Sequence, residues 1–271
     1  MLRILCPTDF SQSAINAMSY AAKFAQTTNA EIILLNVQSI FTLTPNELVR
    51  GKELTIAAIN EQLESQCKEI SRNFKISCYA EVELSGRSLT SVIDEKSIGF
   101  DLILMGTNGV SDYIEFFTGS DTYKVIKRAS TPVLLIPTEC DYSPISSIVY
   151  SVDLQKGENF PLRELINWAK LLKNNVCVLQ VVQGHYSHEI EAELKRSQTE
   201  IKDFYGDEVP LQFDTIWSNE VASSIHSYML RTESDALALC SRHHGFIEGL
   251  FHKSVTKVLS SIARYPVFVF H

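Results

Sequence analysis

The sequence predicts an α/β protein made of two tandem, doubly wound domains, each with a parallel five-stranded sheet and helices on both faces. Short apolar runs alternate along the chain with longer amphipathic stretches, a pattern typical of strands and helices joined by right-handed crossovers. The same succession of strands also appears twice in the 271 residues, a length that suits two domains of ordinary size. We therefore expect domains over residues 1–138 and 145–271, joined by a short polar stretch.

The internal repeat consists of matched strands at two constant offsets. Ile4–Asp9 aligns with Ile148–Asp153 at an offset of 144, and the strand that follows in each half keeps this offset. Later in each half the offset becomes 134, as for Asp101–Met105 and Asp235–Leu239. The second copy is therefore shorter by ten residues in its middle, and duplication explains the pattern better than chance does.

In the first half, several strands are apolar enough to be buried on both faces, as in a parallel sheet. The predicted strands are residues 2–7, 31–38, 76–84, 101–106 and 133–137. Ser11 is a candidate N-cap for the first helix, in which alanines recur at helical spacing from Ala14 to Ala25. Further helices are predicted over residues of about 46–71, 88–97 and 120–129.

Composition excludes several classes of protein. The net charge of −8 argues against a nucleic-acid binder, which needs a basic face to neutralise phosphates. No apolar run approaches the ~20 residues of a spanning helix, and the N-terminus lacks the features of a signal peptide. Six cysteines, scattered singly without a CxxC pair, favour a reducing compartment. We therefore expect a cytoplasmic protein that contacts neither nucleic acid nor membrane.

A glycine constellation follows the strand at 101–106, with the spacing G-x2-G-x9-G-S. Its members are Gly106, Gly109, Gly119 and Ser120. Ligands of open α/β sheets lie beyond the carboxyl ends of the strands, where glycine lets the backbone approach a phosphate. A serine that opens a helix lies among free N–H groups that favour an anion. Any one of these glycines alone is more often a turn residue, but together they predict an anion-binding loop.

Two motifs together resemble the universal stress protein family. They are Pro7-Thr8-Asp9-Phe10-Ser11 after the first strand, and the glycine pattern that precedes Thr131-Pro132-Val133. The resemblance covers essentially the whole chain, twice, and implies an adenine nucleotide α-hydrolase-like fold. In the ATP-binding branch of that family, the glycine and serine loop holds the phosphates and ribose, and residues after the first two strands surround adenine and ribose. The resemblance thus implies a site at Pro7, Thr8, Asp9, Val37, Met105, Gly106, Asn108, Gly109, Gly119, Ser120, Asp121 and Thr122.

Each of these assignments has a structural alternative. Asp9 is also suited to cap the helix that follows it, and Val37 and Met105 are also ordinary core residues. Asp112 and Glu115 place carboxylates near the expected phosphates, which disfavours a free triphosphate or calls for a metal ion. The expected ligand is therefore ATP, or AMP or ADP, with or without Mg²⁺.

The second half has lost the glycines. The positions equivalent to the constellation hold Cys240, His243, Lys253 and Ser254, so we expect no comparable phosphate loop there. These replacements belong to a group of residue types that suit zinc. The group comprises Cys240, His243, His244 and His252, with His226 upstream. Its spacing matches no standard zinc motif, so we assign no metal ligand. Polar loop residues, or another anion pocket with Arg242 and Lys253, remain the alternatives.

No catalytic motif accompanies the predicted site. The sequence has no Walker loop, no G-x-S-x-G nucleophile elbow and no HExxH helix. The predicted function is therefore that of an adenine-nucleotide-binding stress-response protein, regulatory or sensing rather than catalytic. A ligand-free interaction scaffold and a weak ATPase are the alternatives. As in dimers of the family, residues 133–137 and 267–270 are expected to meet in an intramolecular pseudo-dimer, and two chains to form a homodimer.

Overall fold

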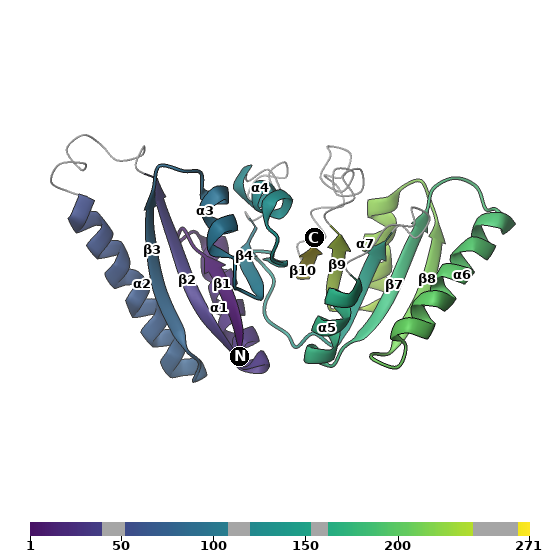
Figure 1. Cartoon of the computed structure of the whole chain (residues 1–271), viewed down its shortest axis with the longest axis horizontal. Coiled ribbons are helices and arrows are strands. Elements are labelled where there is room, and N and C mark those ends of the chain that lie inside the picture. The colour runs from purple at the N-terminus through teal and green to yellow at the C-terminus, as the bar shows by residue number, and fades with distance from the viewer. Residues whose placement is uncertain (40–51, 108–119, 153–161, 241–264) are drawn as a thin grey trace. The chain divides into compact units, whose positions relative to one another are not determined.

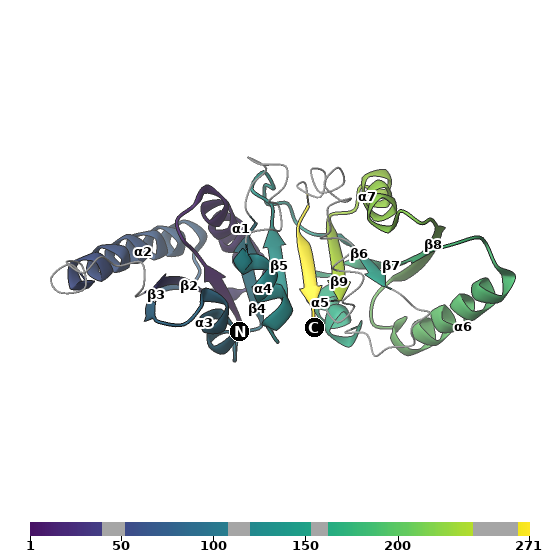
Figure 2. The ribbon, with the colours of Figure 1, turned by 90° about the horizontal axis from the view of Figure 1, so that it is seen from above.

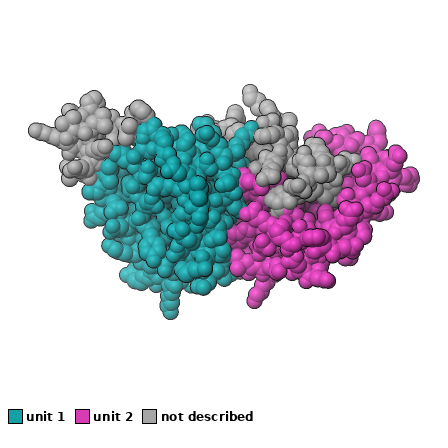
Figure 3. Space-filling model, viewed as in Figure 1, with its two compact units in different colours: residues 1–142 teal, residues 143–271 magenta. Residues whose placement is uncertain are grey.

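The computed structural model describes residues 1–39, 52–107, 120–152, 162–240 and 265–271, and the structural statements below concern this part of the chain. The chain forms two compact units, residues 1–142 and 143–271, which are coloured separately in Figure 3. The boundary between the units falls in the polar stretch 138–144 that the sequence predicts as the join.

Unit 1 is a parallel sheet with the strand order β3-β2-β1-β4-β5. Its strands are β1 (Leu2–Pro7), β2 (Ala30–Ser39), β3 (Cys78–Ser85), β4 (Leu102–Gly106) and β5 (Val133–Ile136). Its helices are α1 (Gln12–Thr28), α2 (Lys52–Phe74), α3 (Leu89–Lys96) and α4 (Ser120–Arg128). Figure 2 shows α1 and α2 on one face of the sheet and α3 and α4 on the other. The predicted doubly wound α/β fold is therefore confirmed.

The largest difference from the predicted elements concerns α2, expected over about 46–71. Residues 46–51 lie outside the described part of the chain, and the helix continues to Phe74. It ends where Lys75 adopts a left-handed conformation, with φ of 56°, and donates its N–H to the carbonyl of Ser71. A lysine in this conformation is uncommon, so the amino-acid pattern does not mark this helix end.

Helix α1 begins and ends as its sequence predicts. The hydroxyl of Ser11 accepts a hydrogen bond from the N–H of Ala14, which makes Ser11 the N-cap. At the other end Asn29 adopts a left-handed conformation, with φ of 54°. Between them, the buried alanines present small side chains to the sheet. This close packing fixes α1 against β1 and β4.

The core of unit 1 is the central part of its sheet. Ile4 and Leu5 of β1, Leu34 of β2 and Ile103 and Leu104 of β4 are all fully buried. Burial of consecutive residues means that both faces of these strands are covered, as expected for a parallel sheet between two helical layers. Each such side chain contributes ~1.5–3 kcal/mol relative to an exposed one. The buried sheet therefore holds the loops at its carboxyl edge in fixed positions.

Unit 2 repeats this architecture, with the strand order β8-β7-β6-β9-β10. Among these strands, Figure 1 labels β7, β8, β9 and β10. Its strands are β6 (Ser147–Val152), β7 (Asn175–Val182), β8 (Leu211–Trp217), β9 (Ala236–Cys240) and β10 (Val267–Phe270). Its described helices are α5 (Leu162–Leu172), α6 (His188–Tyr205) and α7 (Val221–Thr232). Figure 2 shows α5 and α6 on one face and α7 on the other. The tandem arrangement of two like halves is confirmed.

Each unit has an aspartate whose carboxylate anchors the first strand of that unit. In unit 1, Asp101 accepts the N–H of Arg3 at 2.8 Å. Its counterpart in unit 2, Asp235, accepts the N–H groups of Ser146 and Ser147, each at 2.9 Å. In both units an aspartate just before the fourth strand therefore fixes the start of the first.

The six cysteines are all free thiols. In the described part of the chain, no helix combines the length and the apolar character that crossing a bilayer requires.

Candidate functional site

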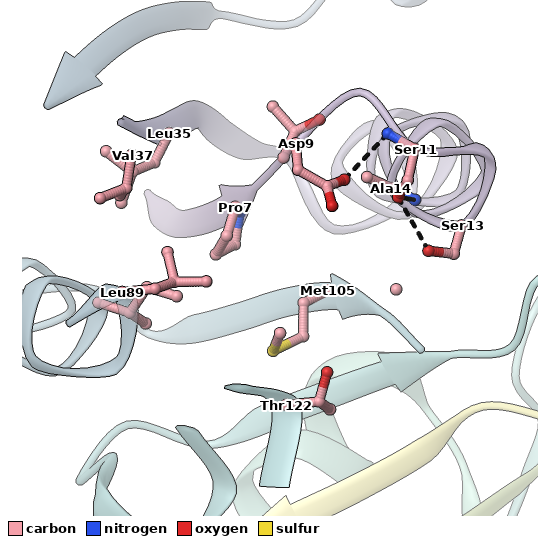
Figure 4. Close-up of a pocket in the computed structure, with 13 residues that line it drawn as sticks. Pro7, Asp9, Ser11, Ser13, Ala14, Leu35, Val37, Leu89, Met105 and Thr122 are labelled. Atoms are coloured by element: carbon pink, nitrogen blue, oxygen red, sulfur yellow. Dashed lines mark hydrogen bonds between the residues drawn. The ribbon is translucent and has the colours of Figure 1, made fainter. Parts of the chain in front are cut away.

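A pocket of 320 Å³ lies at the carboxyl ends of β1, β2 and β4 in unit 1 (Figure 4). From β1 the chain proceeds to β2 and β3 on one side, and then returns to β4 on the other side of β1. The pocket therefore lies at the point where the strand order reverses. In open α/β sheets this crevice is where ligands bind.

Seven of the twelve residues that the family resemblance implies line this one pocket. They are Pro7, Thr8, Asp9, Val37, Met105, Gly106 and Thr122. The others cannot be compared in this way. Asn108, Gly109 and Gly119 lie outside the described residues, together with Asp112 and Glu115. Ser120 and Asp121 open α4, but their side chains are not among those described.

Six lining residues were not assigned to the site from the sequence. Ser11 was identified as the helix cap and as the last residue of the Pro7–Ser11 motif, and Ala14 as a helix residue. Ser13, Leu35, Leu89 and Ile93 complete the six. Leu89 and Ile93 lie one turn apart on α3, so the apolar face of the helix predicted at 88–97 was a signal for them. The apolar pattern predicts which face of the helix is buried, but it does not predict that this face borders the pocket.

The loop after β1 is fixed to β2 by backbone and side-chain hydrogen bonds. The N–H of Thr8 donates to the carbonyl of Leu35 at 2.8 Å. The amide of Asn36, which is almost fully buried, donates to the carbonyl of Thr8, also at 2.8 Å. Phe10 then adopts a left-handed conformation, with φ of 63°, and the chain turns into α1. Thr8 is therefore held on both sides, and the turn presents Asp9 at the pocket.

Asp9 does not cap α1, because Ser11 takes that place. One carboxylate oxygen of Asp9 accepts the N–H of Ser11 at 2.9 Å, a local turn that orients the side chain (Figure 4). Asp9 is exposed. It is also the charged side chain among the described residues that line the pocket. The pocket therefore carries an acceptor that is fixed in direction and open to solvent.

Gly106 ends β4 where α1 begins its first turn. A Cβ at this position would lie 2.5 Å from the carbonyl oxygen of Ser13 and 3.2 Å from the nitrogen of Ala14. From the sequence, Gly106 was assigned to a loop in which glycine lets the backbone approach a phosphate. In the structure the backbone that approaches Gly106 is that of α1, which gives the glycine a packing role of its own.

The walls of the pocket are of two chemical kinds. Pro7, Leu35, Val37, Leu89, Ile93 and Met105 form an apolar part. Thr8, Ser11, Ser13 and Thr122 add hydroxyl-bearing side chains to the wall, which also holds the carboxylate of Asp9. An apolar wall suits a flat aromatic ring, and hydroxyls with a carboxylate suit a polyol such as a sugar. No lysine or arginine is among the described lining residues.

Comparison with known proteins assigns the family. The model described as "Universal stress protein family" matches residues 1–137. The chain belongs to the universal stress protein family. A universal stress protein of Methanocaldococcus jannaschii is 27% identical over 155 residues, which cover 49% of this chain and 93% of the relative. A second one from the same organism is 26% identical over 139 residues, or 49% of this chain and 81% of the relative.

Two solved structures match this universal stress protein along its whole length. A universal stress protein from Archaeoglobus fulgidus has a TM-score of 0.76 at 15% identity, covering 99% of this chain and 97% of that one. A structure from Pseudomonas aeruginosa has a TM-score of 0.61 at 18% identity, covering 99% and 92%. At these identities the likeness shows the fold, and it shows that the tandem arrangement occurs in other members.

The second unit of this universal stress protein differs at the corresponding strand end. Cys240, which is buried, ends β9 where Gly106 ends β4. His226 shares a hydrogen bond of 3.3 Å with the hydroxyl of Tyr265. The remaining residues of the proposed metal or anion cluster, namely Arg242, His243, His244, His252 and Lys253, lie outside the described residues. Within the described ranges, no three His, Cys, Asp or Glu side chains are grouped to hold a metal ion.

Proposed function

We propose that this universal stress protein binds an adenine nucleotide in the pocket of unit 1 and acts as a nucleotide-responsive regulator rather than as an enzyme. The observation that carries the proposal is the convergence of Pro7, Asp9, Val37, Met105 and Thr122, from five different elements or loops, on a single pocket. These positions are scattered over more than a hundred residues of sequence, so a shared ligand is a simple reason for their types.

The apolar part of the pocket suits the base. Val37 and Leu35 of β2, Pro7 of β1 and Met105 of β4 offer flat or flexible apolar surface, against which a purine ring packs well. The carboxylate oxygen of Asp9 that does not accept from Ser11 would accept a ribose hydroxyl. A bond of this charged kind contributes ~1.5–3 kcal/mol.

The phosphates would lie toward the start of α4. Thr122 lies in the first turn of this helix and lines the pocket, so the N–H groups of that turn are near the proposed ligand. Free N–H groups and the helix dipole favour an anion at such a place. Gly109 and Gly119 would complete this part of the site. Because the pocket wall supplies a carboxylate rather than a cation, we expect Mg²⁺ to strengthen ATP binding more than AMP binding.

Calorimetry on the full chain tests the proposal, with AMP, ADP and ATP and with or without Mg²⁺. The informative variant is Asp9→Asn, which keeps an oxygen for the N–H of Ser11 but removes the charge and replaces the second oxygen acceptor by an NH2 donor. We expect the affinity for the best of these ligands to fall by a factor of roughly 10 to 100, as the loss of a charged hydrogen bond implies. Asp153→Asn, at the matching repeat position, is the control and should bind as the wild type does.

The absence of binding for every adenine nucleotide would contradict the proposal and favour a ligand-free scaffold. Equal affinities of the wild type and Asp9→Asn would contradict the role of Asp9. Regulation rather than catalysis predicts that bound ATP is recovered intact. Steady release of phosphate that disappears in Asp9→Asn would instead favour a weak ATPase.

A further inference from the structure

The fold of unit 1 brings together two cysteines that the sequence presents as isolated. Cys67 lies near the end of α2, and Cys78 is the first residue of β3. Helix α2 packs along β3, and the two cysteines line one surface cavity, where each thiol shifts the pKa of the other. A disulfide brings its two sulfur atoms to ~2.05 Å, and two cysteines that face one cavity from packed elements are placed to meet in this way.

The pair is reachable from solvent. Both cysteines line a surface cavity of 680 Å³, next to Lys68 and Arg72. Cys67 has 4% of its surface exposed, while Cys78 is half-buried. In the sheet of unit 1, β3 is the end strand of the order β3-β2-β1-β4-β5, and Figure 1 shows α2 lying along it. A small reagent can therefore enter at the open side of the sheet without unfolding its core.

This cavity is separate from the pocket proposed for a nucleotide. Along the β2–β3 ladder, Cys78 lies opposite Ile32 near the amino end, whereas Val37 lies opposite Glu83 near the carboxyl end. The two cavities share no lining residue among those described. A chemical event at the cysteines is thus independent of the residues assigned to ligand binding.

The surroundings give the two thiols different acidities. The hydrogen bond with Cys78 lowers the pKa of Cys67, against opposing effects of burial and of Glu64. The same bond, with burial, raises the pKa of Cys78. Burial, assisted by Cys67, raises the pKa of the neighbouring Cys6 to about 12. Because the thiolate is the reactive form, Cys67 is suited to be the nucleophile, and Cys78 is suited to be the partner that still carries its proton.

We propose that Cys67 and Cys78 form a reversible disulfide when the protein meets a hydroperoxide. In the first step the Cys67 thiolate attacks the O–O bond, which breaks to give a sulfenic acid on Cys67 and a hydroxide or alkoxide ion. In the second step the Cys78 sulfur attacks the Cys67 sulfur, and the sulfenic oxygen leaves as water with the Cys78 proton. The two thiols supply the two electrons that reduce the peroxide. A low-molecular-weight thiol restores the pair by exchange.

The bond would tie the end of α2 to the start of β3. It would close a loop over the ten residues, 68–77, that lie between Cys67 and Cys78. Closing a short loop of this size limits the freedom of the unfolded chain, so the oxidised protein should unfold at a higher temperature than the reduced protein. Reduction should reverse the increase.

The test uses the folded full-length chain. The protein is treated with hydrogen peroxide, its remaining thiols are blocked, and the tryptic peptides are analysed by mass spectrometry. We expect the peptide of residues 53–68 to be linked to that of residues 76–87, with the loss of two hydrogen atoms, and the link to vanish on reduction. The link should be absent from Cys67→Ser and from Cys78→Ser. Cys140→Ser, which removes a buried thiol elsewhere in unit 1, should keep it.

Two results would overturn the proposal. One is a native protein whose peptides 53–68 and 76–87 remain unlinked while peroxide oxidises other residues. The other is a link from either peptide to residues 4–23, which contain Cys6, because a different pair would then react. Both results come from the wild-type protein, so the test holds even where a serine variant folds poorly.

Discussion

Gly106 and Ser13 approach each other so closely that a Cβ on Gly106 would lie 2.5 Å from the Ser13 carbonyl oxygen. Real side chains do not tolerate such a distance to a backbone atom, so a larger residue would push the first turn of α1 away from the end of β4. Both residues line the pocket of unit 1. The glycine therefore sets the width of the pocket whether or not a phosphate touches it.

Gly106→Ala should destabilise unit 1 by ~1–3 kcal/mol, the usual cost of overpacking, and should also weaken nucleotide binding. Thermal unfolding and calorimetry measure the two effects. Gly184→Ala is the comparison. With φ of 99° and nothing within 4 Å of an added Cβ, it carries backbone strain and no clash. It should lower stability without changing the affinity. An unchanged affinity in Gly106→Ala would contradict the role given to this contact.

Asn36→Ala should weaken ligand binding through the loop that it supports. The variant removes the amide that donates to the Thr8 carbonyl, and leaves that buried acceptor unpaired at a cost of ~1–3 kcal/mol. Gln180 is its counterpart in the repeat and is equally buried. Gln180→Ala should therefore lower stability but leave nucleotide affinity unchanged. Similar losses of nucleotide affinity in both variants would contradict a specific role of the loop after β1 in nucleotide binding.

The anchoring aspartates predict a difference between the units. Asp235 accepts three hydrogen bonds, two from the N–H groups of Ser146 and Ser147 and one from the Ser147 hydroxyl. Asp101 accepts the N–H of Arg3. Hydrogen exchange, read strand by strand, is the suitable measurement because two units need not unfold together. Asp235→Ala should raise exchange in β6 more than Asp101→Ala raises it in β1. The reverse order would contradict this reading of the anchors.

Glu164 predicts a pH dependence in unit 2. Burial raises its pKa above the usual 4.5, so the charged form destabilises the folded state. This loss of stability is absent at a pH below the pKa of Glu164 in the unfolded chain. It is complete at a pH above the pKa of Glu164 in the folded protein. Glu164→Gln should therefore raise the melting temperature at neutral pH, and the gain should fade in acid.

A matched control for Glu164 exists on the neighbouring surface. Lys170 and Arg163 lower the pKa of Glu208, so its contribution stabilises the fold at neutral pH and is lost as the pH falls. Glu208→Gln should thus lower the melting temperature at neutral pH or leave it unchanged, since the pair is exposed. A gain in stability of the same size in both variants would contradict the assigned signs.

The sequence was a good guide to the fold because its signals are local. Apolar runs such as Leu102–Met105 mark buried strands, Ser11 marks a helix start, and the offsets of 144 and 134 mark the duplication. It was a weaker guide wherever residues meet from distant parts of the chain. Nothing in the pattern says that Ser13 packs on Gly106, or that Cys67 meets Cys78. The pairing of residues 133–137 with 267–270 stays a prediction.

The central claim is that the tandem fold carries one adenine-nucleotide site, in unit 1. The stoichiometry of a calorimetric titration of the full chain, with the nucleotide that binds most tightly, tests it most directly. We expect one nucleotide per chain. A value of zero would contradict the site itself, and a value of two would contradict its restriction to unit 1.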